Sequence, residues 1–159
     1  MTNNDLFRRL RYILHFSDSQ MAEIFNQVDQ RMLPGQIASF LKRQEEEGFC
    51  RMDDSIMGFF LDGLINLKRG KREAKPGQRA EKRMIPRTNN DKLKKLRIAF
   101  NLQEASMLEI FSMGDFPINK AELSALFRKK DHRNYKVCGD QGFRKFLNGL
   151  AEYVKREGQ

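Results

Sequence analysis

The chain repeats itself after 86 residues. Thr2-Asn3-Asn4-Asp5 recurs as Thr88-Asn89-Asn90-Asp91, and the same offset carried forward without a gap produces further matches. The matches that end each copy are Phe60-Leu61 with Phe146-Leu147 and Gly63-Leu64 with Gly149-Leu150. A tandem duplication implies that one fold is built twice, so every structural assignment must hold in both copies.

Signals for helix starts come early in each copy. Asn3, Asn4 or Asp5 is expected to cap a first helix, and Ser17 followed by Gln20 resembles a capping box at the start of a second helix. Apolar residues then recur at three- and four-residue spacing, and no segment alternates long enough to predict a strand. These patterns predict an all-helical chain.

The second half of each copy adds two more helices. Pro34 suits the first turn of a third helix that we expect to end near Gly48, and Asp53 or Asp54 begins a fourth, nearly continuously apolar helix. The corresponding signals in the second copy are Asn119 with Glu122, and Asp140.

We therefore predict an all-α fold with two tandem copies of a roughly four-helix unit, packed with pseudo-twofold symmetry because one small unit alone would be only marginally stable. The units cover residues 1–67 and 88–159. Residues 68–87 contain two glycines and two prolines without apolar periodicity, which indicates a linker. Gly63 and Gly149 lie in helix interiors, where glycine costs about 1 kcal/mol relative to alanine, and predict a close helix crossing.

The net charge of +9 is distributed unevenly. Residues 1–67 hold 7 basic and 10 acidic residues, residues 68–87 hold 9 and 2, and residues 88–159 hold 14 and 9. The linker and the second copy therefore carry the positive excess. Such a balance favours an anionic partner, although a linker rich in Lys and Arg also serves solubility.

Features of a membrane or secreted protein are lacking in the sequence. Residues Met1 to Phe7 include an acidic residue and no apolar run of signal-peptide length, and the near-apolar stretch Ile56 to Leu61 is too short to span a bilayer. We expect a cytoplasmic protein with no membrane partner. Cys50 and Cys138 do not occupy equivalent positions, and reduced thiols are expected.

The clearest candidate binding segment is the loop from Arg128 to Lys136, which mixes basic side chains with Tyr135. Basic and aromatic side chains together are typical of nucleic-acid surfaces. The equivalent segment from Lys42 to Cys50 has an acidic centre, Glu45-Glu46-Glu47. The basic loop is thus expected to meet phosphates, or the acidic loop of its own or another chain, or only solvent.

Patterns that indicate catalysis are scarce. Cys138, His132 and Asp140 lie close in sequence, but proximity in sequence is not the geometry that a catalytic triad requires. His15 is the only other histidine, no cysteine pair has zinc spacing, and no glycine-rich phosphate loop is present. We predict no enzymatic activity, no cofactor and no metal.

Other polar residues shared by the copies have structural interpretations. Asp54 and Asp140 precede apolar helical runs and are expected to be N-caps rather than a paired acidic site. Ion pairs between the first two helices are the favoured interpretation of four further residues, with an exposed binding function as the alternative: Arg11, Arg97, Glu23 and Glu109.

Four segments together resemble one known family: Leu10 to Leu14, Phe60 to Gly70, Asn89 to Phe100, and Cys138-Gly139-Asp140-Gln141. The chain is similar over nearly its whole length to the bacterial YehS-type family of tandem domains of unknown function. That resemblance implies an all-helical protein of the bacterial cytoplasm and no established activity, so no functional residues carry over. Gly142 stands where a bulky apolar residue is expected, which leaves the packing at the start of the last helix open.

We hypothesise a non-catalytic binding module that contacts an anionic partner, RNA or DNA, through the linker and the second copy. The alternative is a protein-interaction adaptor or a homodimeric structural protein. The predicted contact residues are Arg97, Arg128, Lys129, Lys130, Arg133, Tyr135 and Lys136 in the second copy and Lys68, Arg69, Lys71 and Arg72 in the linker.

Overall fold

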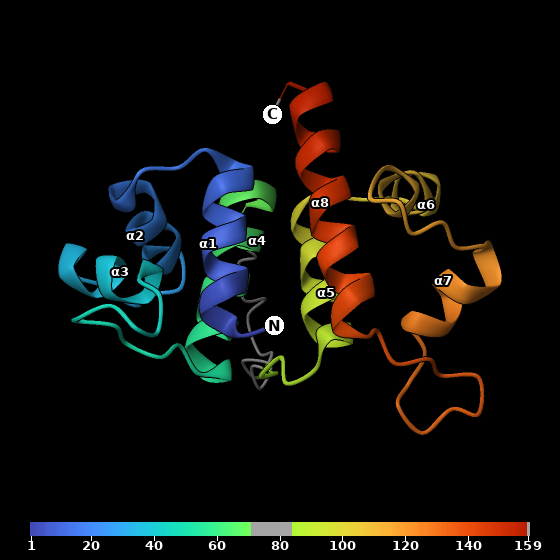
Figure 1. Ribbon diagram of the computed structural model, residues 1–159, viewed down its shortest axis with the longest axis horizontal. Coiled ribbons are helices and arrows are strands. Elements are labelled where there is room, and N and C mark those ends of the chain that lie inside the picture. The colour runs from blue at the N-terminus through green and yellow to red at the C-terminus, as the bar shows by residue number, and fades with distance from the viewer. Residues whose placement is uncertain (71–83, 159) are drawn as a thin grey trace, which may run out of the picture.

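The computed structural model describes residues 1–70 and 84–158, and this part of the chain contains eight α-helices and no strand (Figure 1). The predicted all-helical fold is thus confirmed. The helices of the first repeat are α1 (Asn3–Leu14), α2 (Asp18–Asn26), α3 (Pro34–Leu41) and α4 (Asp54–Arg69). Those of the second repeat are α5 (Asn89–Ala99), α6 (Glu104–Met113), α7 (Lys120–Leu126) and α8 (Asp140–Arg156).

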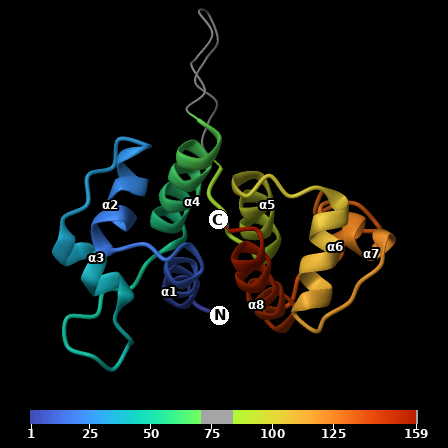
Figure 2. The same ribbon diagram turned by 90° about the horizontal axis from the view of Figure 1, so that it is seen from above.

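Helices α1, α4, α5 and α8 form the centre of the molecule, with α2 and α3 on one flank and α6 and α7 on the other (Figures 1 and 2). Helix α4 packs against α5, and α1 packs against α8. Because α1 is equivalent to α5 and α4 to α8, each of these two contacts is the counterpart of the other. The repeats are therefore related by an approximate twofold axis. Their buried apolar side chains form one connected core, which compensates for the small size of each unit.

The repeated Thr-Asn-Asn-Asp segments start the first helix of each repeat. The Thr2 hydroxyl accepts a hydrogen bond from the backbone N–H of Asp5 at 3.1 Å, and the Asp5 carboxylate accepts one from the Thr2 N–H at 3.2 Å. Thr88 and Asp91 form the same capping box on α5. The prediction that Asn3 or its successors cap the helix was therefore wrong, because the threonine hydroxyl takes that role.

The second asparagine of each segment is buried and holds the loop between the third and fourth helices. Asn4 Nδ2 donates to the carbonyl oxygens of Phe40 and Cys50 at 3.0 and 2.8 Å, and Asn4 Oδ1 accepts from the Met52 N–H at 3.0 Å. We call this arrangement the asparagine clamp. Asn90 forms the same three bonds, at 2.9, 2.8 and 2.8 Å, with Leu126, Lys136 and Cys138.

The first asparagine of each segment joins the start of its repeat to the last helix. Asn3 donates to Asp54 Oδ1 and Asn89 donates to Asp140 Oδ1, both at 2.8 Å. The hydrogen bond from Asn89, helped by the terminal amine 2.5 Å from the carboxylate, lowers the pKa of Asp140. Each aspartate is therefore held in its charged form at neutral pH.

The predicted cap roles of Asp54 and Asp140 are wrong by one residue. Asp53 is the N-cap of α4, where its carboxylate accepts a backbone N–H at 2.8 Å, and Gly139 occupies the cap position of α8. Asp54 and Asp140 are instead the first helical residues. Their carboxylates are therefore available for bonds to other parts of the fold.

The third helix of the first repeat is shorter than predicted. It ends at Leu41 instead of near Gly48, because Lys42 adopts an extended conformation with φ −70° and ψ 156°. The asparagine clamp accounts for this, since it draws Phe40 and Cys50 to one side chain and forces the intervening residues into a loop. By contrast, the predicted capping pairs of Ser17 with Gln20 and of Asn119 with Glu122 are confirmed.

The predicted close helix crossings are confirmed at both glycines. A Cβ atom added to Gly63 would lie 2.0 Å from the carbonyl oxygen of Ile24, and one added to Gly149 would lie 1.9 Å from that of Ile110. Helix α4 therefore packs backbone to backbone against α2, and α8 does the same against α6. No side chain larger than hydrogen fits there, which explains why glycine is tolerated despite its cost to the helix.

Polar contacts between the repeats also follow the offset. Lys95 Nζ lies 2.5 Å from Asp62 Oδ1, and at the equivalent place Arg9 donates to Asn148 Oδ1 at 3.1 Å. An ion pair on one side of the axis thus corresponds to a charge-assisted hydrogen bond on the other.

One interface contact breaks this symmetry. Lys92 occupies the position of the core residue Leu6, is largely buried, and extends its Nζ to 3.3 Å from Asp54 Oδ1. Burial raises the pKa of Asp54, but the hydrogen bond from Asn3 and the charge of Lys92 outweigh it, so the pKa lies below its ordinary value. Asp54 therefore connects α1, α4 and α5.

The polar residues of the first two helices use other partners than predicted. Arg11 Nε lies 3.3 Å from Asp18 Oδ1 rather than pairing with Glu23. Glu109 pairs with Arg156 of α8 instead of Arg97. Within the described part of the chain, no helix is both long and apolar enough to cross a membrane.

We predict that Gly149→Ala destabilises the protein by about 3 kcal/mol, because the added methyl group collides with the backbone of α6 and the helices must move apart. Urea unfolding followed by circular dichroism measures the change. Gly35→Ala is the matched control, because no atom lies within 4 Å of its new Cβ, and should alter stability by less than about 1 kcal/mol. Equal effects of the two substitutions would contradict the close crossing.

Asp54→Asn should lower the unfolding free energy at pH 7 by about 0.5–1 kcal/mol, a value limited by partial solvent exposure of the pair. Because the folded pKa lies below the reference value of 3.8, the stabilisation is present above that value and disappears as pH falls through the folded pKa. Urea titrations at pH 7 and at about pH 2 should therefore show the difference only at pH 7. Glu152→Gln, on the exposed face of α8, should have little effect at either pH.

Candidate functional site

A basic groove lies in the second repeat, beside the start of α5. It is a hollow of about 330 Å³ whose polar lining is mainly cationic. Its cationic lining side chains are Arg87, Lys94, Arg128, Lys129 and Lys130, its aromatic ones are Phe127 and Tyr135, and Asp91 also lines it. Two segments distant in sequence thus contribute to it: residues 84–94, which lead into and form the start of α5, and residues 126–135, which end α7 and form the loop after it.

Short-range hydrogen bonds shape the loop that carries most of these cations. The His132 N–H donates to the Lys129 carbonyl oxygen and the Tyr135 N–H donates to that of His132, both at 2.9 Å, and the Asn134 N–H donates to His132 Nδ1 at 3.0 Å. The asparagine clamp of Asn90 holds both ends of the loop. The loop therefore projects from the body of the protein with a defined backbone (Figure 1).

The cations of the basic groove are exposed, and four of the five lack acidic partners in the described part of the chain. No carboxylate within residues 1–70 and 84–158 forms an ion pair with Lys94, Arg128, Lys129 or Lys130. Asp91 also lines the hollow, but its carboxylate accepts the N–H groups of Arg87 and Thr88 at 3.1 and 3.3 Å. The groove is consequently positive.

Besides Phe127, on which Arg97 stacks, Tyr135 is an aromatic side chain of the basic groove. Its side chain is partly buried, and this burial, together with the charges of Asp91 and Cys138, raises the pKa of the phenol above its ordinary value. The phenol is thus neutral across the physiological range. It offers an uncharged ring among cations, where a base or another planar group can stack.

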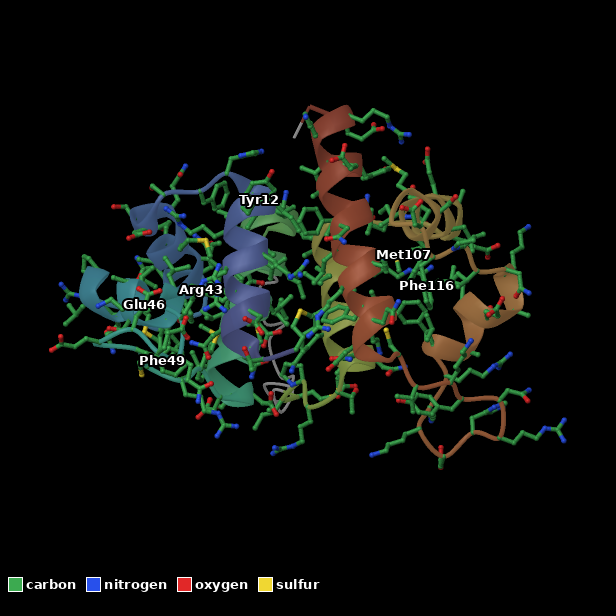
Figure 3. All side chains as sticks on the ribbon, in the orientation of Figure 1. Tyr12, Arg43, Glu46, Phe49, Met107 and Phe116 are labelled. Carbon is green, nitrogen blue, oxygen red and sulfur yellow. The ribbon has the colours of Figure 1, made fainter. Side chains whose placement is uncertain are left out.

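The first repeat has an equivalent hollow with a different charge. Arg8, Arg43 and Phe49 occupy the positions of Lys94, Lys129 and Tyr135, but Glu45 and Asp54 also line this larger hollow of about 720 Å³. Arg8 forms an ion pair with Asp5. Figure 3 shows Arg43 and Phe49 on the flank opposite the second repeat's loop. Arg51 and Lys92 line the first hollow too, so it holds four cationic side chains and three carboxylates, whereas the second holds five and one. The same architecture is therefore less positive in the first repeat than in the second.

Three of the seven predicted contact residues in the second repeat lie outside the basic groove. Lys136 Nζ is 3.2 Å from Glu122 Oε2, so its charge is already paired. Arg133 lines a shallow hollow on the other side of the same loop, with Arg128 and Lys129. Arg97 stacks its guanidinium 4.8 Å from the centre of the Phe127 ring and donates to the carbonyl oxygen of Leu102 at 3.2 Å.

The predicted linker residues are distributed over two regions. Lys68 and Arg69 are the last residues of α4, and Lys68 Nζ lies 4.6 Å from the centre of the Phe100 ring. Burial against α5 lowers the pKa of Lys68. Lys71 and Arg72 lie outside the described residues.

Sequence reasoning did not single out Arg87 and Lys94 as contact residues. The sequence offers only a partial signal for them: Lys94 lies one helical turn after the capping Asp91, and Arg87 directly precedes the Thr88 cap. Side chains one turn apart lie on the same helix face, so Lys94 lies on the same face as Asp91. That signal identifies the helix face but does not identify the loop that meets it.

The residues considered for catalysis are engaged in other ways. Cys138 is buried, its Sγ lies 3.8 Å from the Gly139 carbonyl oxygen, and burial, with the charge of Asp140, raises its pKa to about 11. His132 Nδ1 accepts the Asn134 N–H within the loop. Among the described residues, no group of three or more His, Cys, Asp or Glu side chains could hold a metal ion.

Two copies of one four-helix domain that share a core define the chain as a tandem-repeat helical protein. It belongs to the family described as protein of unknown function (DUF1456), which matches residues 3–70 and 89–156. It is 40% identical over 158 residues to the uncharacterized protein YehS of Escherichia coli (strain K12), and this match covers 98% of the chain and 99% of that relative. No solved structure gives a significant match.

We predict that the two cysteines differ strongly in reactivity. Cys50 is exposed, whereas Cys138 is buried and its raised pKa of about 11 keeps the thiol protonated at neutral pH. A thiol reagent at pH 7 should modify Cys138 at least about a hundredfold more slowly than Cys50, as followed by mass spectrometry. Cys50→Ser should abolish the fast phase, and denaturant should restore the reaction of Cys138. Rapid modification of Cys138 in the folded protein would contradict its assigned burial.

Proposed function

We propose that this protein is a non-catalytic binding module that holds single-stranded RNA or DNA in the basic groove of its second repeat. The observation that carries the proposal is the convergence of five cations on one hollow, four of which have no carboxylate partner within residues 1–70 and 84–158. Unpaired exposed cations raise the local concentration of a polyanion and release its counterions on binding.

The lining of the basic groove favours phosphate contacts over base-edge contacts. Lysine and arginine side chains from a loop and from α5 approach from different directions, which suits a flexible backbone of repeated phosphates. Among the described residues, α5 contributes Lys94 and its capping residues to the groove and α7 contributes only Leu126, so no helix there presents a row of polar side chains for reading a duplex edge. Binding is therefore expected to depend weakly on sequence.

Tyr135 supports a single-stranded partner. Its ring lies among the cations of the basic groove and is neutral, so an unstacked base can pack on it while neighbouring phosphates meet Lys129 and Lys130. Base stacking on an aromatic ring contributes about 1–3 kcal/mol per base. A duplex keeps its bases stacked internally and would gain only the phosphate contacts.

Contact between copies of the chain is the rival explanation of the basic loop. Figures 1 and 3 place the loops that follow α3 and α7 at opposite ends of the molecule, so they do not meet within one chain. Two copies related by a twofold axis could pair each acidic loop with the other copy's basic loop and form a closed dimer. The other arrangement is head-to-tail contact. Such contacts produce open-ended assemblies unless they close into a ring, which light scattering distinguishes from nucleic-acid binding.

The test is fluorescence anisotropy of a labelled single-stranded oligonucleotide at several salt concentrations. We expect a dissociation constant on the order of micromolar at low salt and a log–log salt slope of about −3.5 for five phosphate contacts. Replacing Arg128, Lys129 and Lys130 with alanine should reduce the slope to about −1.4, because three contacts are lost. Tyr135→Leu should weaken the binding of the single strand and leave the binding of a duplex of the same sequence unchanged.

Arg43→Ala is the matched control, because Arg43 is the first-repeat equivalent of Lys129 and lies in the less positive hollow. It should leave affinity and slope unchanged. Absence of binding at low salt would overturn the proposal. A loss from Arg43→Ala equal to the loss from Lys129→Ala alone, which removes the same charge, would do so as well, because it would indicate attraction by net charge alone. Salt-sensitive assemblies without oligonucleotide binding would favour the rival explanation.

A further inference from the structure

An apolar hollow of about 410 Å³ lies in the second repeat, between α8, α7 and the segment that joins α6 to α7. Its walls are formed by Phe111, Phe116, Ile118, Leu126, Cys138 and Gly142. Lys136 and Glu122 lie at its rim, together with Val137, of which 68% is exposed. The hollow has the size and the largely apolar walls of a small-molecule site.

Comparison of the repeats explains why the hollow exists. Under the 86-residue offset, three residues of the first repeat have smaller counterparts in its wall: Phe40 corresponds to Leu126, Met52 to Cys138, and Ile56 to Gly142. Phe40 and Met52 are buried in the first repeat. A well-packed core rarely loses three large side chains from one place, because each vacated volume costs contacts.

Two further positions around the hollow are polar in the first repeat and apolar in the second. Gln30 corresponds to Phe116, and Arg51 corresponds to Val137. The Phe116 ring lies between α8 and α7 (Figure 3), and an added Cβ on Gly142 would stand 3.3 Å from it. Glycine therefore lets this partly exposed ring lie against α8 as one wall of the hollow. This resolves the packing that the sequence left open at Gly142.

Polar groups around the hollow carry no net charge. The Cys138 thiol is buried and protonated. At the rim, Lys136 and Glu122 neutralise each other at 3.2 Å. A charged ligand head would be attracted by one of these two groups and repelled by the other. A hydroxyl group can accept a hydrogen bond from Lys136 and donate one to Glu122.

We propose that this hollow is a binding site for an uncharged amphipathic small molecule with an apolar body and one hydroxyl-type head. The body packs between Phe111, Phe116 and Leu126, and the head meets the Lys136–Glu122 pair. This site shares only Leu126 with the lining of the basic groove. It differs from that groove in its ligand chemistry and does not depend on nucleic-acid binding.

The probe is 1-octanol, titrated into the full chain while methyl resonances are recorded by NMR. Saturable shifts should be confined to methyl groups around the hollow, such as those of Ile118, Leu126 and Val137. Octanoate and octylammonium, which share the chain but carry opposite charges, should each bind at least about tenfold more weakly than 1-octanol. Equal binding of all three would overturn the assigned head chemistry.

Two substitutions restore first-repeat residues. Cys138→Met should fill part of the hollow and weaken 1-octanol binding at least about tenfold. Val137→Arg, at an exposed position that does not threaten folding, should also weaken it by blocking the rim with a polar chain. Arg51→Val, the reverse exchange at the equivalent exposed position of the first repeat, is the control and should leave binding unchanged. Shifts spread over both repeats, or unchanged affinity in both hollow variants, would overturn the site.

Discussion

The asparagine clamp is the interaction on which both the architecture and the candidate site depend. A single buried amide in each repeat satisfies two carbonyl oxygens and one N–H of a loop that has no regular secondary structure of its own. Leaving those backbone groups unpaired in the interior would cost about 1–3 kcal/mol each. In the second repeat the same amide positions Lys136 and Cys138, and so fixes where the basic groove ends and the apolar hollow begins.

The two repeats retain their internal architecture and differ in surface chemistry. Capping threonines, clamp asparagines and crossing glycines recur in both, because each is required by backbone geometry. The loop after α3 is acidic at its centre while the loop after α7 is basic, and the wall beside Phe40 is filled while that beside Leu126 is hollow. Both proposed functions lie in the second repeat, where the differences gather.

Local and repeated features could be predicted from the sequence, whereas features that depend on distant contacts could not. The capping pair of Ser17 with Gln20 needs only neighbours in the chain, and the crossing at Gly63 was indicated by its equivalent at Gly149. The end of α3 was predicted too late because the bond from Asn4 to Phe40 joins residues 36 apart. For the same reason, the contribution of Lys94 to the basic groove and the stacking of Arg97 on Phe127 required the fold.

The clamp also makes the two connecting loops structurally interchangeable. Each loop has the same length between the same anchor points, and its backbone is held by an amide that lies outside the loop. Side chains between the anchors therefore bear little of the fold's stability. After a duplication, the residues of such a loop can be substituted without changing the packing of either core. One fold can therefore acquire a different surface in each repeat.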